Sequence, residues 1–309
     1  MNSNSNSNST TSTTSTSSTP NTSTTSKPTN IGICGLGCVG NSMYQHFLKN
    51  TSVKPVGYDK FKQPFDSEEI FQEILKTDMV FLCLPTLYDP AKEQYNKDAI
   101  FDVCKRLNEG KYKGLVVLKS TVEPETTEKL SDKYQDMDFA HNPEFLSAAT
   151  CFEDFTNQPH VVLGKSPHCD EKKFNGLVEF YKQFWPYSEY SLCSSFESEL
   201  MKSGCNSFYA FKIAYFNTLF LLTQEHSKLN DKEDPHKTYN NAVSMMLKNG
   251  WINPMHTKIA PDGRLGFGGA CFPKDINAMN QYVKSKGLMN GHIDGVVEFN
   301  RSLRNDVPY

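Results

Sequence analysis

The sequence predicts an α/β protein with a Rossmann-type, mainly parallel sheet, followed by a helical region with one long central helix. Three observations support this prediction. Short apolar runs alternate with helical stretches between residues 30 and 194, a Gly-x-Gly-x-x-Gly motif follows the first run, and helical spacing of apolar residues dominates from Phe196. Strand–helix alternation is typical of parallel sheets, because two parallel strands need a crossover connection.

The first 29 residues are almost entirely Ser, Thr and Asn. Such a segment buries too little apolar surface to offset the entropy lost on ordering, so we expect residues 1–29 to form a disordered tail. The segment has neither the basic start nor the apolar stretch of a secretory signal.

Charge and cysteine usage exclude several classes of protein. The net charge of −3 gives no electrostatic reason to expect a nucleic acid or membrane-surface partner. No apolar run reaches the roughly 18 residues that a membrane span needs. The nine cysteines form no CxxC pair and no metal-ligand spacing. We therefore expect reduced thiols, a cytoplasmic location and no metal site.

The first predicted strand, Asn30 to Cys34, runs into the glycine motif. In such a motif the first glycine makes the turn, the second admits a pyrophosphate and the third lets the helix pack on the strand. The helix N-terminus adds amides and a favourable dipole. The motif predicts a dinucleotide site at Gly35, Gly37, Cys38, Val39 and Gly40; the alternative is a tight turn that binds no ligand.

A second predicted strand, Val53 to Tyr58, ends at Asp59. An acidic residue about 20 positions after the glycines accepts hydrogen bonds from a ribose 2′-hydroxyl. The same charge repels a 2′-phosphate, so Asp59 favours NAD over NADP.

Further predicted strands end at polar residues. They run from Met79 to Leu84, from Leu115 to Lys119, over Phe139-Ala140, and from His160 to Leu163. Ligands of parallel sheets bind beyond the carboxyl ends of the strands. We therefore expect part of a site at Thr86, Ser120, Thr121 and Glu144, although each one alone is also typical of a cap or turn.

The helical region, expected at 195–309, begins with one long helix from about Phe196 to Asp234. Lys202 and Asn206 lie four residues apart near its start and so share one face. On an arbitrary helix they would be a solvated lysine and a surface amide. The helix is more apolar than a solvent-facing helix needs to be.

The stretch from Gly266 to Asp275 places three glycines, Cys271, Lys274 and Asp275 within ten residues. Glycines let backbone approach a ligand, and a cysteine flanked by ionisable groups is placed as a nucleophile. The alternative is a loop with a buried, inert cysteine.

From Ile31 to about Arg304 the chain resembles the UDP-glucose/GDP-mannose dehydrogenase family, and most closely its members that oxidise UDP-glucose. The Asn-Pro-Glu-Phe-Leu block and the cysteine block together are specific to this family. The matching blocks are 35–40, 84–86, 120–122, 142–146, 199–202 with Asn206, and 266–275.

The resemblance implies NAD-dependent, four-electron oxidation of the C6 alcohol of a nucleotide sugar, with UDP-glucose giving UDP-glucuronate, by a homodimer. It implies that the Cys271 thiolate attacks an aldehyde formed in the site, giving a thiohemiacetal and then a thioester. Lys202 and Asn206 match oxyanion donors, Glu144 a general base and Asp275 an acid that handles water or protons.

The resemblance also assigns contacts. Thr121 matches a threonine that places water, and with Thr86, Ser120 and Asp59 it is expected near the cofactor. The residues expected to contact the substrate are Glu144, Phe145, Leu146, Lys202, Asn206, Phe267, Gly268, Gly269 and Lys274.

Three departures from the family pattern affect these expectations. Ala148 stands where members usually carry a second acid, and Trp251 to Pro254 replaces an Arg-Ile-Gly segment, for which Arg264 is a candidate substitute. The sequence also ends before the family's C-terminal domain, which holds much of the nucleotide.

Alternative functions remain open. Within the family, GDP-mannose or a UDP-N-acetylhexosamine could be the substrate. A β-hydroxyacid dehydrogenase resembles this chain in its glycine motif and its Lys-x-x-x-Asn helix, but performs one oxidation without a cysteine nucleophile. A non-catalytic NAD-binding protein is the third alternative.

Overall fold

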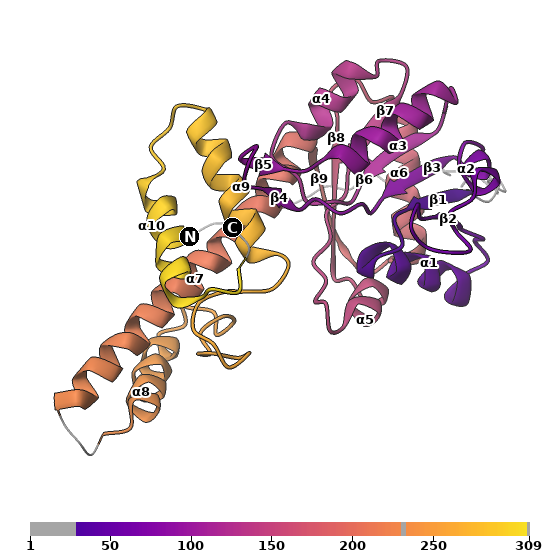
Figure 1. The fold of residues 1–309 in the computed structure, drawn as a ribbon. Helices are drawn as coiled ribbons and strands as arrows, with labels where there is room; N and C mark the ends of the chain where they lie inside the picture. Colours follow the sequence, from indigo (N-terminus) through magenta and orange to yellow (C-terminus); the bar gives the residue numbers. More distant parts are fainter. Residues whose placement is uncertain (1–28, 230–232, 308–309) are drawn as a thin grey trace, which may run out of the picture.

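The computed structural model describes residues 29–229 and 233–307. The tail predicted at residues 1–29 therefore lies outside the described residues, apart from Thr29. A seven-stranded sheet and the helices around it form the first part of the chain, and a set of helices around one long helix forms the second part (Figure 1).

The sheet has the strand order β2-β1-β3-β6-β7-β8-β9. All neighbouring pairs are parallel except β7 and β8, which confirms the predicted mainly parallel sheet. The strands are β1 (Ile31–Cys34), β2 (Val56–Tyr58), β3 (Met79–Leu82), β6 (Leu115–Leu118), β7 (Asp138–His141), β8 (His160–Lys165) and β9 (Glu189–Ser194).

Helices cover both faces of the sheet. One apolar core packs under α1 (Cys38–Asn50), α5 (Cys151–Thr156) and α6 (Glu171–Phe184). The other packs under α2 (Glu68–Ile74), α3 (Asp98–Glu109) and α4 (Thr126–Lys133). Because both faces are buried, the central strands are continuous apolar runs, which is why the sequence predicted them.

Two features of this part were not predicted. Strand β9 is largely exposed at the sheet edge and lacks an apolar run. The short hairpin β4 (Tyr88–Asp89) and β5 (Gln94–Tyr95) lies in the connection after β3. The predicted β2 begins three residues before the observed strand, and the predicted β3 ends two residues after it.

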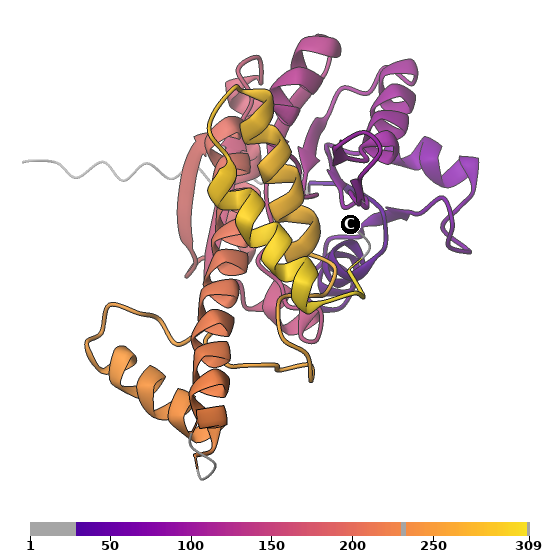
Figure 2. The same cartoon turned by 60° about the vertical axis from the view of Figure 1, so that its left-hand side comes forward.

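The long helix α7 (Ser195–Leu229) starts against the sheet and projects away from it (Figures 1 and 2). The helices α9 (Phe272–Ser285) and α10 (Gly291–Leu303) pack along its first half, and α8 (Pro235–Lys248) packs at its far end. Cys271 is the N-cap residue of α9, so the cysteine loop leads directly into this helix.

Candidate active site

The first glycine loop has the shape of a phosphate cradle. Gly35 adopts φ +90°, and a Cβ there would lie 2.5 Å from the Cys83 carbonyl oxygen. A Cβ on Gly40 would lie 1.8 Å from the Gly35 oxygen, whereas a Cβ on Gly37 would meet no described atom within 4 Å. Strand and helix therefore pack closely, and open space remains above Gly37 at the N-terminus of α1. These residues fit a bound pyrophosphate.

Asp59 lies where the dinucleotide ribose is expected. Its Oδ2 accepts a hydrogen bond from the Leu36 amide at 2.8 Å, and its Oδ1 accepts one from the Phe61 amide at 3.0 Å. These bonds join the end of β2 to the glycine loop. A carboxylate has about four acceptor positions, so Asp59 keeps capacity for ribose hydroxyls.

One cavity of about 1010 Å³ is lined both by the glycine loop and by Cys271. It places predicted cofactor residues and predicted catalytic residues around a single space. The predicted residues in its lining are Gly35, Gly37, Cys38, Val39, Asp59, Thr86, Ser120, Thr121, Glu144, Cys271 and Lys274. Those outside the lining are Gly40, Phe145, Leu146, Lys202, Asn206, Phe267, Gly268, Gly269 and Asp275.

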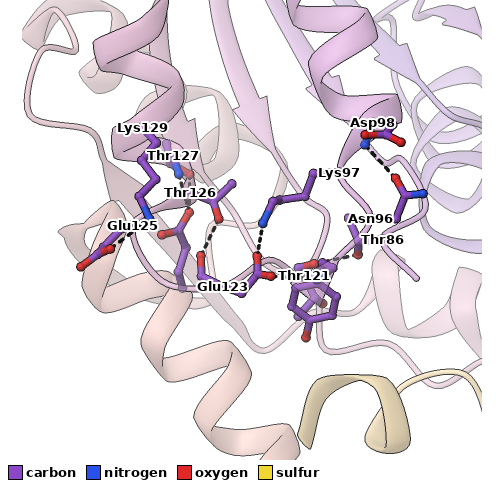
Figure 3. A network of polar contacts seen from close by, with 12 residues as sticks. Thr86, Asn96, Lys97, Asp98, Thr121, Glu123, Glu125, Thr126, Thr127 and Lys129 are labelled. Carbon is purple, nitrogen blue, oxygen red and sulfur yellow. Dashed lines mark hydrogen bonds and ion pairs between the residues drawn. The ribbon is translucent and has the colours of Figure 1, made fainter. Parts of the chain in front are cut away.

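The polar residues after β3 and β6 bind one another. Ser120 donates its hydroxyl to the Leu84 carbonyl at 2.7 Å and accepts from the Leu84 amide at 2.9 Å. Thr86 donates its hydroxyl to the Thr121 carbonyl at 2.7 Å (Figure 3). These contacts fix the two strand ends side by side at the cavity.

Lys202 pairs with Glu144, although the two lie far apart in sequence. Its Nζ lies 3.2 Å from Glu144 Oε1, and both side chains are largely buried. Glu144 Oε2 also accepts from the Leu146 amide at 2.6 Å, and Lys202 Nζ lies 5.2 Å from the centre of the Phe145 ring. The lysine on α7 therefore holds the Asn-Pro-Glu loop, in addition to any contact with a ligand.

Lys119 is a site residue that the sequence did not single out. It lines the cavity at the end of β6, where it donates from Nζ to Asn142 Oδ1 at 2.6 Å. Burial lowers the pKa of Lys119 to about 8. The sequence carried no signal for this role, because a lysine closing a strand is ordinary.

Asp275 is fully buried and does not line the cavity. Its Oδ2 accepts from Asn206 Nδ2 at 2.6 Å, and its Oδ1 accepts from the Tyr95 hydroxyl at 2.5 Å and from Lys274 Nζ. An amide NH₂ has two hydrogens, so Asn206 keeps one for another acceptor. Tyr95 lies in the unpredicted hairpin, 180 residues from Asp275, and nothing in the sequence pointed to it.

Cys271 is exposed at the cavity, although the surrounding protein partly desolvates its sulfur. This partial burial raises the pKa of the Cys271 thiol; Lys274 lowers it and Asp275 raises it. Desolvation is the largest of these effects, so it outweighs the neighbouring lysine.

Side chains from distant helices hold the cysteine loop. Asn300 accepts from the Phe267 amide at 2.7 Å and donates to the Phe267 carbonyl at 3.0 Å. The Gly266 amide donates to Asn217 Oδ1 at 2.9 Å. The Arg304 guanidinium lies close to Gly268, and a Cβ on Gly268 would be 2.6 Å from it. Crowding by Asn300 and Arg304 explains Gly266 and Gly268 without a ligand, whereas Gly269 has open space around it and adopts φ +78°.

The cysteines depart from the prediction at one pair. Cys38 in the first glycine loop and Cys151 at the start of α5 form a disulfide with Cα atoms 6.3 Å apart. The expectation of uniformly reduced thiols is therefore wrong for this pair. The two cysteines are 113 residues apart, and only the packing of α1 against α5 brings them together.

The described residues form neither a metal-binding cluster nor a membrane-spanning helix. Across residues 29–229 and 233–307, no three His, Cys, Asp or Glu side chains gather closely enough to bind a metal ion. In the same part of the chain, no helix combines the length and the apolar character needed to cross a membrane.

Comparison with known proteins agrees with this geometry. Residues 44–185 match the UDP-glucose/GDP-mannose dehydrogenase family, NAD binding domain. A UDP-glucose 6-dehydrogenase of Rickettsia felis is 30% identical over 236 residues, which cover 72% of this chain and 46% of that protein. The chain spans about half the length of the curated relatives it matches.

Solved structures share the fold. A UDP-glucose dehydrogenase from Pyrobaculum islandicum superimposes with a TM-score of 0.73 at 24% identity, over 91% of this chain and 70% of that one. A 3-hydroxyisobutyrate dehydrogenase of Mycobacterium tuberculosis has a TM-score of 0.64 at 14% identity, over 89% of this chain and 93% of that one. Such identities concern the fold alone.

The glycine cradle, the acid after β2 and the matched residues agree with one another. Residues 44–185 belong to the UDP-glucose/GDP-mannose dehydrogenase family, as its NAD-binding domain, and NAD is the cofactor.

Proposed function

We propose that this protein oxidises the C6 alcohol of a nucleotide sugar to a carboxylate, with UDP-glucose as the first candidate substrate and two NAD consumed per sugar. The observation that carries the proposal is the single cavity lined by Gly37, Asp59, Glu144, Cys271 and Lys274. It joins an NAD cradle to a cysteine nucleophile, and a cysteine lets an aldehyde be held covalently between two oxidations.

NAD, held by the glycine loop and Asp59, supplies the hydride acceptor for each oxidation. The first oxidation removes a hydride and a proton from the alcohol and leaves an aldehyde. The Cys271 sulfur adds to the aldehyde carbon, its proton leaves, and the oxygen becomes a thiohemiacetal hydroxyl. The second oxidation removes a hydride and a proton from this adduct and gives a thioester.

Water then displaces the sulfur and releases the acid. Glu144 lines the cavity and is proposed to take the proton of that water, with Thr121 positioning it. Lys202 and the free N–H of Asn206 are proposed to stabilise the developing oxyanion. Lys202 also pairs with Glu144, so its cationic group lies beside the proposed base.

The test is NADH formation from a panel of UDP- and GDP-sugars, with the yield measured per sugar consumed. We expect two NADH per UDP-glucose and formation of the uronic acid. Turnover of GDP-mannose or a UDP-N-acetylhexosamine instead would reassign the substrate within the family. Absence of turnover with every member of the panel would contradict the proposal.

One alternative has support from the fold. The 3-hydroxyisobutyrate dehydrogenase has a similar fold over nearly its whole length, so a single oxidation of a β-hydroxyacid is the second candidate. One NADH per substrate, together with no effect of Cys271 replacement, would favour it. A non-catalytic NAD-binding protein would show neither turnover nor fast alkylation of Cys271 relative to the other cysteines.

The proposal includes a homodimer formed through α7 in the cytoplasm. Exposed apolar side chains recur every seven residues along this helix, at Phe208, Tyr215, Leu222 and Leu229. Such a stripe is typical of a helix that packs on a partner. Light scattering should therefore give about twice the chain mass of 34.9 kDa, and a monomer at micromolar concentration would contradict the dimer.

A further inference from the structure

Tyr95 brings a hydroxyl from the sheet region onto the helix that follows Cys271. The residue lies in β5 and is 1% exposed. Its hydroxyl donates to Asp275 Oδ1 at 2.5 Å. Burial raises the pKa of Tyr95 well above its ordinary value, and the neighbouring Asp275 charge raises it further. Tyr95 is therefore a neutral donor over the whole working range of pH.

The hairpin that carries Tyr95 is tied to the loop after β6. The Tyr95 amide donates to Glu123 Oε1 at 2.8 Å, and Lys97 Nζ lies 2.6 Å from Glu123 Oε2 (Figure 3). Both charged side chains are largely buried, at 16% and 11% exposure. A buried ion pair with this geometry fixes the backbone that it joins. Glu123 follows Thr121 by two residues, so the same loop contributes to the cavity.

Asp275 connects Tyr95 to groups of the proposed site. Asn206 donates to its Oδ2, and Lys274 donates to the oxygen that also binds Tyr95. Lys274 Nζ lies 4.8 Å from the centre of the Tyr95 ring. Lys274 lines the cavity, whereas Tyr95 is not part of the lining formed by the described residues. Contacts through Asp275 and Lys274 therefore link Tyr95 to the cavity.

We propose that Tyr95 is a positioning residue for the oxidation, because its phenol holds the Asp275 carboxylate and weakens the field of that carboxylate at the Cys271 sulfur. This inference rests on the proposed function of Cys271. The positive end of the O–H dipole points at Asp275. Without it, the full carboxylate charge acts on the sulfur and disfavours the thiolate.

Charged side chains from three segments of the chain affect the pKa of the Cys271 thiol. Lys274 and Asp275 lie on α9, Glu144 comes from the loop after β7, and Lys202 comes from α7. Partial burial is the largest cause of the raised pKa, Lys274 and Lys202 lower it, and Asp275 and Glu144 raise it. Replacing Tyr95 by Phe leaves these groups in place and removes only one donor to Asp275.

The test compares the pH dependence of Cys271 alkylation in the wild type and in Tyr95→Phe. Iodoacetamide is added without NAD or sugar, from about pH 6 to pH 10, and the Cys271 peptide is quantified by mass spectrometry. In Tyr95→Phe we expect the inflection of the alkylation rate against pH to move up by about half a pH unit. At pH values below the inflection, Cys271 should therefore be alkylated about threefold more slowly than in the wild type. Superimposable curves would overturn the proposal.

Tyr112→Phe is the matched control. Tyr112 is equally buried, and its hydroxyl contacts Thr77 Oγ1 at 3.3 Å, away from the cavity. Its alkylation curve should match that of the wild type, and an equal shift in both variants would reject a specific role for Tyr95. If Tyr95→Phe does not fold, Glu123→Gln provides the test instead. This substitution loosens the hairpin and should raise the inflection of the alkylation curve by a smaller amount. No rise in a folded Glu123→Gln would then overturn the proposal.

Turnover supplies the second readout. In Tyr95→Phe we expect kcat to fall about tenfold with KM and NAD affinity unchanged, because Tyr95 is not among the residues that line the cavity. A rise in KM without a fall in kcat would reject a positioning role. If the wild type oxidises no nucleotide sugar, the proposed function fails, while the alkylation curves still decide whether Tyr95 controls Cys271.

Discussion

The loop at residues 35–40 is held by its own backbone, whereas the loop at residues 266–269 is held by side chains from other helices. Gly35 and Gly40 are required by contacts with backbone atoms of Cys83 and Gly35. Gly266 and Gly268 are instead crowded by Asn300 of α10 and by Arg304, which follows that helix. A local motif can specify the first loop, but the second depends on the folded helical region.

Replacing Gly40 by Ala should have the largest effect on this comparison. The new Cβ would lie 1.8 Å from the Gly35 oxygen, and backbone cannot move aside as a side chain can. We expect loss of detectable NAD binding and a destabilisation of about 3 kcal/mol or more. Calorimetric titration with NAD and thermal unfolding measure the two effects.

Gly37→Ala is the matched control within the same loop. Its Cβ would meet no described atom within 4 Å, so stability should stay near that of the wild type while NAD binding weakens. Equal unfolding temperatures for the Gly40 and Gly37 variants would show that backbone contacts do not hold this loop.

Lys202→Ala should have the next largest effect, on activity. It removes a proposed oxyanion donor and leaves Glu144 without its cationic partner in a largely buried place. We expect both oxidations to slow by about 100-fold or more. Steady-state kinetics with UDP-glucose measure this loss, and Lys212→Ala, further along α7, should leave the rate unchanged. A loss below threefold in Lys202→Ala would remove Lys202 from the mechanism.

Gly268→Ala should cost less than Gly40→Ala, because its clash is with a side chain. The Cβ would approach the Arg304 guanidinium to 2.6 Å, and we expect a destabilisation of about 1–2 kcal/mol. Arg304→Ala in the same chain should remove most of the clash that Gly268→Ala adds. A double-mutant cycle by chemical unfolding measures this coupling, and strict additivity would contradict the assigned contact.

Asp59→Ala should have the smallest effect. Asp59 also accepts hydrogen bonds from the Leu36 and Phe61 amides, so part of its role is to shape the loop. We expect NAD binding to weaken by about tenfold and the preference over NADP to relax. Equal use of NAD and NADP by the wild type would contradict the assignment.

The features of the fold that depend on residues close together in the sequence could be predicted. The parallel strands are continuous apolar runs, and the glycine motif, α1 and Asp59 form one local unit, so their order along the chain fixes their arrangement. The exposed edge strand β9 and the β4–β5 hairpin lack such a signal, since neither has a buried apolar run.

The site could be predicted only in part. The resemblance supplied Cys271, Lys202, Asn206, Asp275 and Glu144, but not their partners. These partners come from segments that lie 33 to 180 residues apart in the chain. The pairs are Tyr95 with Asp275, Cys38 with Cys151, and Asn300 with the Phe267 backbone. Such contacts follow from tertiary packing, which no short pattern encodes.

The role of Cys271 is tested most directly by the product that Cys271→Ser makes from UDP-glucose and NAD. We expect two NADH and one uronic acid per sugar for the wild type and for Cys193→Ser, a control on β9. For Cys271→Ser we expect unchanged NAD binding but no uronic acid, because a serine hydroxyl is scarcely ionised and attacks the aldehyde poorly. Uronic acid formed by Cys271→Ser at near the wild-type rate would show that Cys271 is not the nucleophile.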